Sequence, residues 1–276
     1  MRVHVMALLA VTSMGCVSTS TMGLARTLNR GAVQGWVAGE GGGIITANTT
    51  ASTPTGVPTG TTGTGYPMIE GGVRVGVSDH AELGARLGFS GIGLEGKFAI
   101  LRSPTMDSGF NLSIAPQVGF FGLGVAGLFA GNLSAQLPVL MGIDFAGHEL
   151  VFGPKLLNQL FLVGITTSSG TGTAAVDLLS AGASVGIALN VGPLRLMPEV
   201  SFVVPFFASG VVSGATGASA VGVGGFIFQA GLGVLFGSQN SYERPVEPPA
   251  PAPAPMPLPL PPAGDSPPPL PPPSAQ

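Results

Sequence analysis

The sequence predicts an all-β fold: an antiparallel sheet closed into a barrel that crosses a membrane. The main observation is an alternation of period two across residues 66–101. There, Glu70 and Arg74 alternate with Val73 and Val75. Successive side chains of a strand face opposite ways, so this pattern predicts strands. A charged face opposite a hydrocarbon face suits a wall between a wet lumen and lipid.

Composition is the second observation, and it argues against an ordinary soluble domain. Charged residues make up 8% of the chain, whereas a globular domain carries about 25%. Glycine accounts for 45 of 276 residues. A net charge of -3 gives no basic patch of the kind that nucleic-acid binding requires. The single cysteine excludes an internal disulfide.

Residues 1–15 have the features of a secretory signal peptide. Arg2 supplies a positive charge, residues 5–11 are apolar, and Gly15 precedes Cys16. The pair Gly15-Cys16 resembles the end of a bacterial lipobox, which implies that Cys16 is lipidated and becomes the mature N-terminus. An ordinary signal peptide that contains a cysteine is the alternative. Residues 16–30 then read as a periplasmic lead-in.

The barrel itself is assigned to residues 31–237, with ten strands, although eight or twelve are also compatible with the pattern. Four prolines fall inside the proposed strands and require bulges, because proline removes a ladder donor; they are Pro116, Pro138, Pro154 and Pro198. The predicted strands are residues 32–45, 66–77, 81–89, 93–101, 110–121, 133–145, 150–162, 176–191, 194–206 and 221–236.

The connections between these runs alternate in length. Long connections are predicted at residues 46–65, 122–132, 163–175 and 207–220, and short ones at 78–80, 102–109, 146–149 and 192–193. The third connection, residues 90–92, is the one exception, because it is short where a long one is permitted. Outer-membrane barrels have long loops outside and short turns in the periplasm. The alternation therefore predicts that both termini are periplasmic.

The last run, GGFIFQAGLGVLF, ends at Phe236. It resembles the closing strand of small bacterial outer-membrane β-barrels of the porin-like superfamily. The resemblance covers residues 30–236 and implies a barrel surrounded by outer-membrane lipids. It also implies that the barrel-assembly machinery reads the terminal aromatic Phe236 during biogenesis.

Residues 238–276 form a proline-rich periplasmic tail, because 16 of the 26 prolines lie in residues 241–276. Such a segment favours polyproline II and is predicted to be disordered. It resembles the linkers that join barrels to peptidoglycan-binding domains, which implies contact with peptidoglycan or a periplasmic protein. A solvated tail without a ligand is the alternative.

The inward-facing charges are balanced, five acids against five bases. A balanced set favours a buried ion-pair network and a closed or nearly closed lumen, since isolated charges away from water are costly. An excess of one sign would instead predict ion selectivity. The set comprises Glu40, Glu70, Arg74, Glu82, Arg86, Glu95, Lys97, Lys155, Arg195 and Glu199.

Other functions have weaker support in the sequence. Residues 122–127 read G-x-G-x-x-G, with Asp144 about twenty residues on, which matches a dinucleotide fingerprint but lacks further βα units. No metal-ligand spacing and no nucleophile elbow beside a plausible partner occur, so neither a cofactor nor enzymatic activity is expected. The expected function is a structural or interaction barrel, or a narrow passive channel for small solutes. A polytopic helical membrane protein and a membrane-embedded enzyme are the alternatives.

Overall fold

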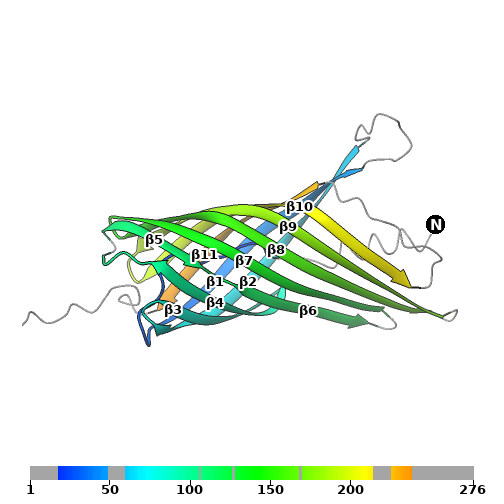
Figure 1. Ribbon diagram of the computed structural model, residues 1–276, viewed down its shortest axis with the longest axis horizontal. Helices are drawn as coiled ribbons and strands as arrows, with labels where there is room; N and C mark the ends of the chain where they lie inside the picture. The colour runs from blue at the N-terminus through cyan, green and yellow to red at the C-terminus, as the bar shows by residue number, and fades with distance from the viewer. Residues whose placement is uncertain are drawn as a thin grey trace, which may run out of the picture. The chain divides into compact units, whose positions relative to one another are not determined.

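The chain forms a closed antiparallel transmembrane β-barrel (Figure 1). The computed structural model describes residues 18–48, 60–105, 107–125, 128–167, 170–213 and 225–237. The strands are β1 (Val33–Asn48), β2 (Gly60–Ser78), β3 (Ala81–Gly88), β4 (Gly91–Leu101), β5 (Ser108–Ile114), β6 (Gln117–Val125), β7 (Leu128–Phe145), β8 (His148–Thr167), β9 (Gly170–Val191), β10 (Leu194–Ser213) and β11 (Gly225–Gly237).

The sheet has no free edge because its first and last strands pair with each other. β1 pairs with β11 from Gln34↔Gly237 to Thr46↔Gly225. β5 and β6 both lie between β4 and β7, so together they act as one wall strand, and the ring has ten strands. The predicted fold class and strand number are therefore confirmed.

The four prolines lie in or beside interruptions of the ladders, but the predicted bulges are absent at Pro138, Pro154 and Pro198, because the register is the same on both sides of each gap. Pro116 lies in the break between β5 and β6. Pro138 and Pro154 flank a gap in the β7–β8 ladder, which stops at Pro138↔Lys155 and resumes at Met141↔Phe152. Pro198 lies in a similar gap of the β9–β10 ladder. Missing proline donors thus coincide with missing pairs.

The connections differ from the prediction at one end of the barrel. β6 and β7 continue through residues 122–132 and leave only 126–127 between them, while β8 and β9 leave only 168–169. Glycine, alanine and threonine gave these segments the composition of loops, but antiparallel pairing needs only their backbone groups. Longer connections remain at 49–59 and 214–224. We call the end of the barrel that carries these two connections the long-loop end.

The opposite end carries the connections 79–80, 102–107, 146–147 and 192–193, and we call it the short-turn end. The β7–β8 turn has Ala146 at φ +49° and Gly147 at φ +80°. Two successive residues at positive φ characterise the tight turn whose twist suits a β-hairpin. β1 begins at this end and β11 finishes there.

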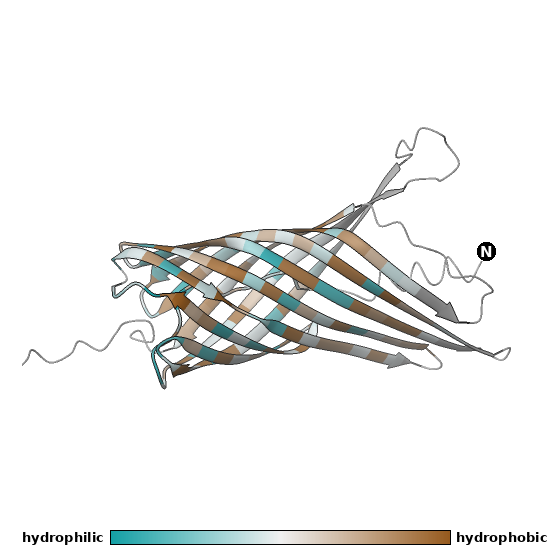
Figure 2. Cartoon of the chain, in the orientation of Figure 1, coloured by the Kyte–Doolittle hydropathy of each residue, from teal (hydrophilic) through white to brown (hydrophobic). Residues whose placement is uncertain are grey.

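The two faces of the wall have opposite chemistry, which Figure 2 shows as alternating colours along each strand. Large apolar residues such as Leu87 and Phe98 are exposed on the outside, at 66% and 51%. Most of the charged side chains in the strands are buried inside. Within the described residues, no helix is long and apolar enough to cross a bilayer. The helical alternative therefore finds no support.

The dinucleotide fingerprint has a different structure from the one that its chemistry needs. Gly122 and Gly124 lie in β6 and pair with Gly131 and Phe129 of β7. A pyrophosphate site requires a turn followed by a helix N-terminus. Gly122 and Gly124 instead belong to a strand of the wall, and Gly127 lies outside the described residues.

Neighbouring leucine substitutions test the alternation of the wall. Ala85→Leu adds hydrocarbon to the outward face, so the free energy of unfolding should change by less than about 1 kcal/mol. Arg86→Leu leaves buried Glu70 without its cation and should cost about 3 to 5 kcal/mol. Urea unfolding in lipid vesicles measures both variants.

The charge control is Ala85→Arg, which should cost about 2 to 4 kcal/mol if position 85 lies near the bilayer midplane. Equal effects of leucine at positions 85 and 86 would contradict a wall of period two.

Candidate functional site: a segment held inside the barrel

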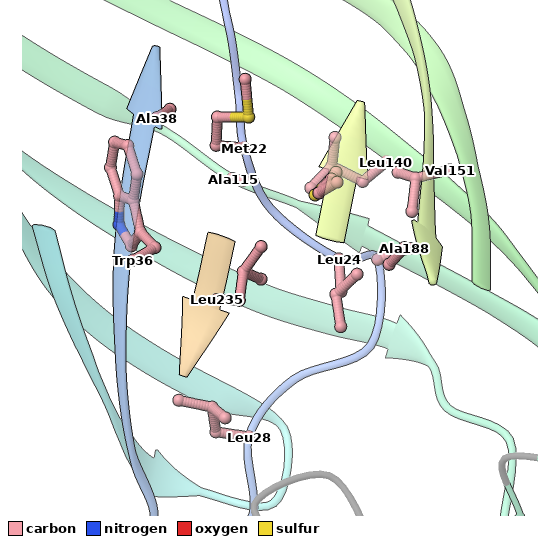
Figure 3. Packing of buried hydrophobic residues seen from close by; sticks show 12 residues of the cluster. Met22, Leu24, Leu28, Trp36, Ala38, Ala115, Leu140, Val151, Ala188 and Leu235 are labelled. Carbon is pink, nitrogen blue, oxygen red and sulfur yellow. The ribbon is translucent and has the colours of Figure 1, made fainter. Parts of the chain in front are cut away.

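Residues 18–29, with the sequence STSTMGLARTLN, lie inside the barrel, and we call them the lumen segment. All twelve residues are buried although none of them belongs to a helix or strand. The sequence placed these residues in a periplasmic lead-in outside the barrel. The structure instead makes residues 18–29 the contents of the lumen, and Figure 3 shows this part of the chain passing between the walls.

Wall carboxylates accept hydrogen bonds from the backbone of the lumen segment. Glu199 accepts from the backbone nitrogens of Thr21 and Met22, each at 2.8 Å. Glu149 accepts from the nitrogens of Ala25 and Arg26, at 2.9 and 3.2 Å. The same role is taken by Glu82 at Leu28 (2.8 Å) and by the amide of Gln229 at Thr19 (2.6 Å).

Wall cations donate to the carbonyl oxygens of the same segment. Arg74 donates from Nη1 to the Met22 oxygen at 2.8 Å and from Nη2 to the Thr21 oxygen at 3.1 Å. Lys97 donates to the Leu24 oxygen at 2.9 Å, and Lys155 donates to the Thr19 oxygen. Hydrogen bonds to ionised groups are roughly twice as strong as neutral ones. The lumen segment is thus held by its backbone, through both donors and acceptors.

These contacts follow one direction along the lumen. Leu28 binds Glu82, which is close to the β2–β3 turn at the short-turn end. Thr19 binds Gln229, well inside β11. Ser18 donates to Glu40 and accepts from Arg86. The segment therefore runs from the short-turn end into the lumen with its amino end deepest.

Apolar side chains of the segment pack against apolar wall residues that face inward. Met22 has a backbone φ of +36°, a conformation that costs of order 1 to 3 kcal/mol and persists only when surrounding contacts fix it. Trp36, 1% exposed, is the largest wall residue in this cluster. The cluster contains Met22, Leu24, Ala25, Leu28, Trp36, Ala38, Ala115, Leu140, Val151, Ala188, Met197 and Leu235 (Figure 3).

Inward-facing glycines leave the room that the segment occupies. A Cβ at Gly231 would lie 2.8 Å from the Met22 methyl, and one at Gly233 would lie 2.9 Å from the Met22 sulfur. A Cβ at Gly76 would lie 2.1 Å from the backbone oxygen of Asn29. Each of these distances is shorter than normal van der Waals contact. Any larger residue at these positions would displace the segment.

Ion pairs along the wall complete the interior. Arg74 pairs with Glu95, Arg86 with Glu70, and Lys97 with Glu82 at 2.6 Å. Arg74 and Arg86 also lie over the ring of Trp36, at 5.2 and 5.7 Å from the ring centroid. All three pairs lie on the neighbouring strands β2, β3 and β4, so they line one side of the lumen with paired charge.

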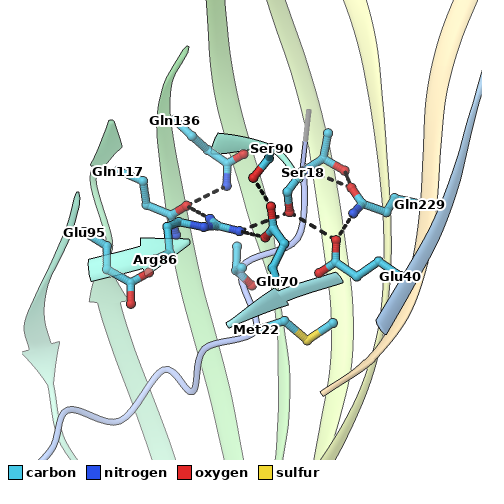
Figure 4. A network of polar contacts seen from close by, with 12 residues as sticks. Ser18, Met22, Glu40, Glu70, Arg86, Ser90, Glu95, Gln117, Gln136 and Gln229 are labelled. Carbon is cyan, nitrogen blue, oxygen red and sulfur yellow. Dashed lines mark hydrogen bonds and ion pairs between the residues drawn. The ribbon is translucent and has the colours of Figure 1, made fainter. Parts of the chain in front are cut away.

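A polar layer lies at the amino end of the segment (Figure 4). Ser18 contacts Glu40 and Arg86, and Gln229 donates to Glu40. On the opposite side, Arg86 donates to Gln117 at 2.8 Å. This layer connects β1, β2, β3, β6 and β11 through side chains.

At the short-turn end the segment is tied to the turns. Arg26 lies 3.5 Å from Asp144 and donates to the backbone oxygen of Thr105 at 2.6 Å. Thr27 donates to the backbone oxygen of Asp79 at 2.7 Å, and Arg102 donates to Asn29. The carboxyl end of the segment is thereby anchored where it leaves the barrel.

Small cavities remain beside the lumen segment. One of about 30 Å³ is lined in part by Ser18, Arg86, Asn132 and Gln136, and another of about 10 Å³ lies near Arg74. A single water molecule needs a cavity of roughly 10 to 15 Å³. These spaces suit individual water molecules rather than a solute.

The predicted lumen charges lie on the inner face of the wall, but they are not all equally buried. Arg195 is only partly buried, while Phe236 lies on the outer face at 46% exposure. Cys16 and the tail 238–276 lie outside the described residues. Each of the other nine predicted charges contacts either the lumen segment or another member of the set. They are Glu40, Glu70, Arg74, Glu82, Arg86, Glu95, Lys97, Lys155 and Glu199.

Sequence reasoning missed Glu149 and the segment itself. Glu149 was assigned to a short turn, yet it is the second residue of β8 and is fully buried. The predicted strand began at Leu150. Had it begun one residue earlier, the alternation of faces would have placed the Glu149 carboxylate in the lumen. In the part of the chain that is described, no group of three His, Cys, Asp or Glu residues could hold a metal ion.

No protein-family model and no curated protein matches the chain. Among solved structures, the chain is similar to the outer membrane protease OmpT from Escherichia coli, at 10% identity and a TM-score of 0.45, covering 79% of this chain and 100% of that one. Ail, the attachment invasion locus protein of Yersinia pestis, matches at 6% identity and a TM-score of 0.34, covering 75% and 99%. Neisserial surface protein A matches at 8% and 0.27, covering 74% and 96%. Identities of 10% or less and TM-scores below 0.5 carry no inference about function.

Proposed function

We propose that this chain is a bacterial outer-membrane barrel with a structural or interaction role, closed in its resting state by its own lumen segment. The observation that carries the proposal is the burial of all of residues 18–29 inside the barrel. The hydrocarbon outer face and the signal-like residues 1–15 support the outer-membrane location.

Closure is supported by the way in which the interior is filled. Carboxylates and cations of the wall bind the segment rather than lining an open channel. A wide pore would leave such groups to water, as in barrels with water-filled lumens. The balanced charges thus serve to hold a plug, and the resting barrel should not conduct.

A narrow passive channel is the second candidate, and it needs the segment to leave. Without residues 18–29, the inner face would combine glycines, serines, amides and charges with the apolar wall residues of the cluster, and water could fill the space that the segment leaves. The buried side chains Ser201, Gln159 and Glu149 illustrate this lining. In this form the protein would pass small solutes only while the plug is displaced.

The remaining parts of the chain supply the proposed partners. Phe236 would be read by the barrel-assembly machinery, and the tail 238–276 would contact peptidoglycan or a periplasmic protein. Cys16 would carry lipid; because Ser18 lies deep in the lumen, a lipid that reaches the bilayer would require the lumen segment to lie outside the barrel in the lipidated protein. We propose no enzymatic activity.

Removing the plug tests closure directly. The intact refolded protein should show no conductance steps in a planar bilayer, whereas a variant lacking residues 18–28 should conduct, because the lumen then fills with water. Replacing residues 18–28 with glycine and serine of equal length is the matched control; it retains the backbone groups but loses the apolar side chains that pack in the cluster, so it should conduct more than the intact protein and less than the deletion. Far-UV circular dichroism verifies that each variant is folded. Equal conductance of the intact and deleted proteins would refute closure.

Lipidation of Cys16 gives a separate prediction. The mature protein should start at Cys16 and carry acyl mass, and Cys16→Ser should abolish both. Intact-mass spectrometry of protein purified from membranes decides this. A mature chain that starts elsewhere without acyl mass would leave an ordinary signal peptide as the explanation.

Sidedness can be measured with epitope tags on intact cells. A tag within residues 49–59 should be labelled from outside, and a tag after residue 237 should not, because an even number of wall strands returns the chain to its starting side. Labelling of the tail tag from outside would reverse the proposed orientation.

A further inference from the structure

We propose that the lumen is a binding site for a short polypeptide, and that it can accept one from a separate molecule in place of residues 18–29. The ligand would enter through the short-turn end with its amino end first. It would carry the pattern apolar, glycine, apolar, as in Met22-Gly23-Leu24. This inference rests on the contacts of the lumen segment and does not depend on whether the barrel conducts.

The chemistry of the site is specific for a peptide chain. Glu199, Glu149 and Glu82 accept from backbone nitrogens, while Arg74 and Lys97 donate to backbone oxygens. A sugar, an ion or a hydrocarbon cannot offer donors and acceptors at this alternation. Most of the wall's own backbone groups are used in its ladders, so charged side chains replace the strand edge at which peptides usually bind.

Side-chain pockets add a preference for sequence. Met22 fits against Gly231 and Gly233, where no wall side chain intervenes. Position 23 favours a small residue, because a Cβ there would lie 3.3 Å from the Thr21 oxygen, which is tight, and 3.6 Å from Arg74, which is ordinary contact, so a branched side chain would crowd Arg74. Thr19 adds a hydroxyl contact to Gln229 at 2.7 Å.

The segment is joined to the barrel by few residues. Arg30 and Gly31 are exposed, and β1 begins at Val33. The contacts near this junction are hydrogen bonds from the Gly31 nitrogen to Gly76 and from the Arg30 nitrogen to Asp79. A cut between Arg30 and Gly31 would therefore leave the contacts of the segment with the wall intact.

The experiment uses the full chain with a protease recognition sequence inserted between Arg30 and Gly31. After refolding in detergent and cleavage, the released fragment should remain with the barrel in gel filtration. The cut protein is then unfolded in urea and refolded with a tenfold excess of a fluorescent peptide of residues 18–29. The labelled peptide should elute with the barrel and saturate at one per barrel.

Matched controls separate peptide recognition from simple trapping. A scrambled peptide of the same composition, and a peptide with valine at the position of Gly23, should each bind at least about tenfold more weakly, because their side chains no longer match the spaces beside Gly231, Gly233 and Arg74. Glu199→Ala in the barrel should weaken binding similarly, because Thr21 and Met22 lose their acceptor. The control variant is Leu232→Ala. Leu232 lies in β11 on the outer face of the wall, so this change should leave binding unchanged.

The outcomes decide the proposal in either direction. Equal binding of the scrambled and native peptides would overturn it, as would the absence of label from a folded barrel. A cut protein that cannot refold with peptide, under conditions where the uncut chain refolds, would also overturn it. Closure is judged separately by the conductance of the uncut chain, so failure of one proposal leaves the other standing.

Discussion

The hydrogen bonds between wall charges and the backbone of residues 18–29 are the interaction on which the interior depends. Closing the sheet uses most of the wall's backbone groups, so few remain to pair with a chain inside. A segment without regular structure would then bury its N–H and C=O groups unpaired, at a high free-energy cost. Glu199, Glu149 and Lys97 would be equally costly without partners. The wall charges and the backbone groups of the lumen segment satisfy each other's hydrogen bonds. Loss of either group leaves the other buried with fewer partners.

This arrangement also accounts for the composition of the chain. Charge is scarce because the outer surface meets lipid and most of the strand charges face the lumen. Glycine is abundant partly because the lumen must hold a second layer of chain: Gly231 and Gly233 admit Met22, and Gly76 admits the backbone at Asn29. The interior thus resembles a binding cleft in its packing, with Trp36 and Leu235 contributing hydrocarbon among the charges.

The strands could be predicted from the sequence because period two survives wherever one face meets lipid and the other meets charge. Arg74 and Glu95 were assigned to the lumen in this way, although their pairing with each other was not. Strand ends beyond the apolar zone, such as residues 122–132, lack that contrast and read as loops. The position of the lumen segment could not be predicted from the sequence for another reason. Its sequence has no period, and its partners are remote, as with Thr19 and Gln229, which are 210 positions apart.

The short connection between Asn29 and β1 has a consequence for competition. A ligand tethered by so few residues is presented to its site at an effective concentration in the millimolar range or above. A free peptide with the same contacts would have to exceed that concentration to replace the tethered segment in an uncut chain. The tether therefore makes the intact barrel nearly indifferent to passing polypeptides. A single cleavage at Arg30 would remove this advantage and expose the site to mass action, without altering any residue that touches the ligand.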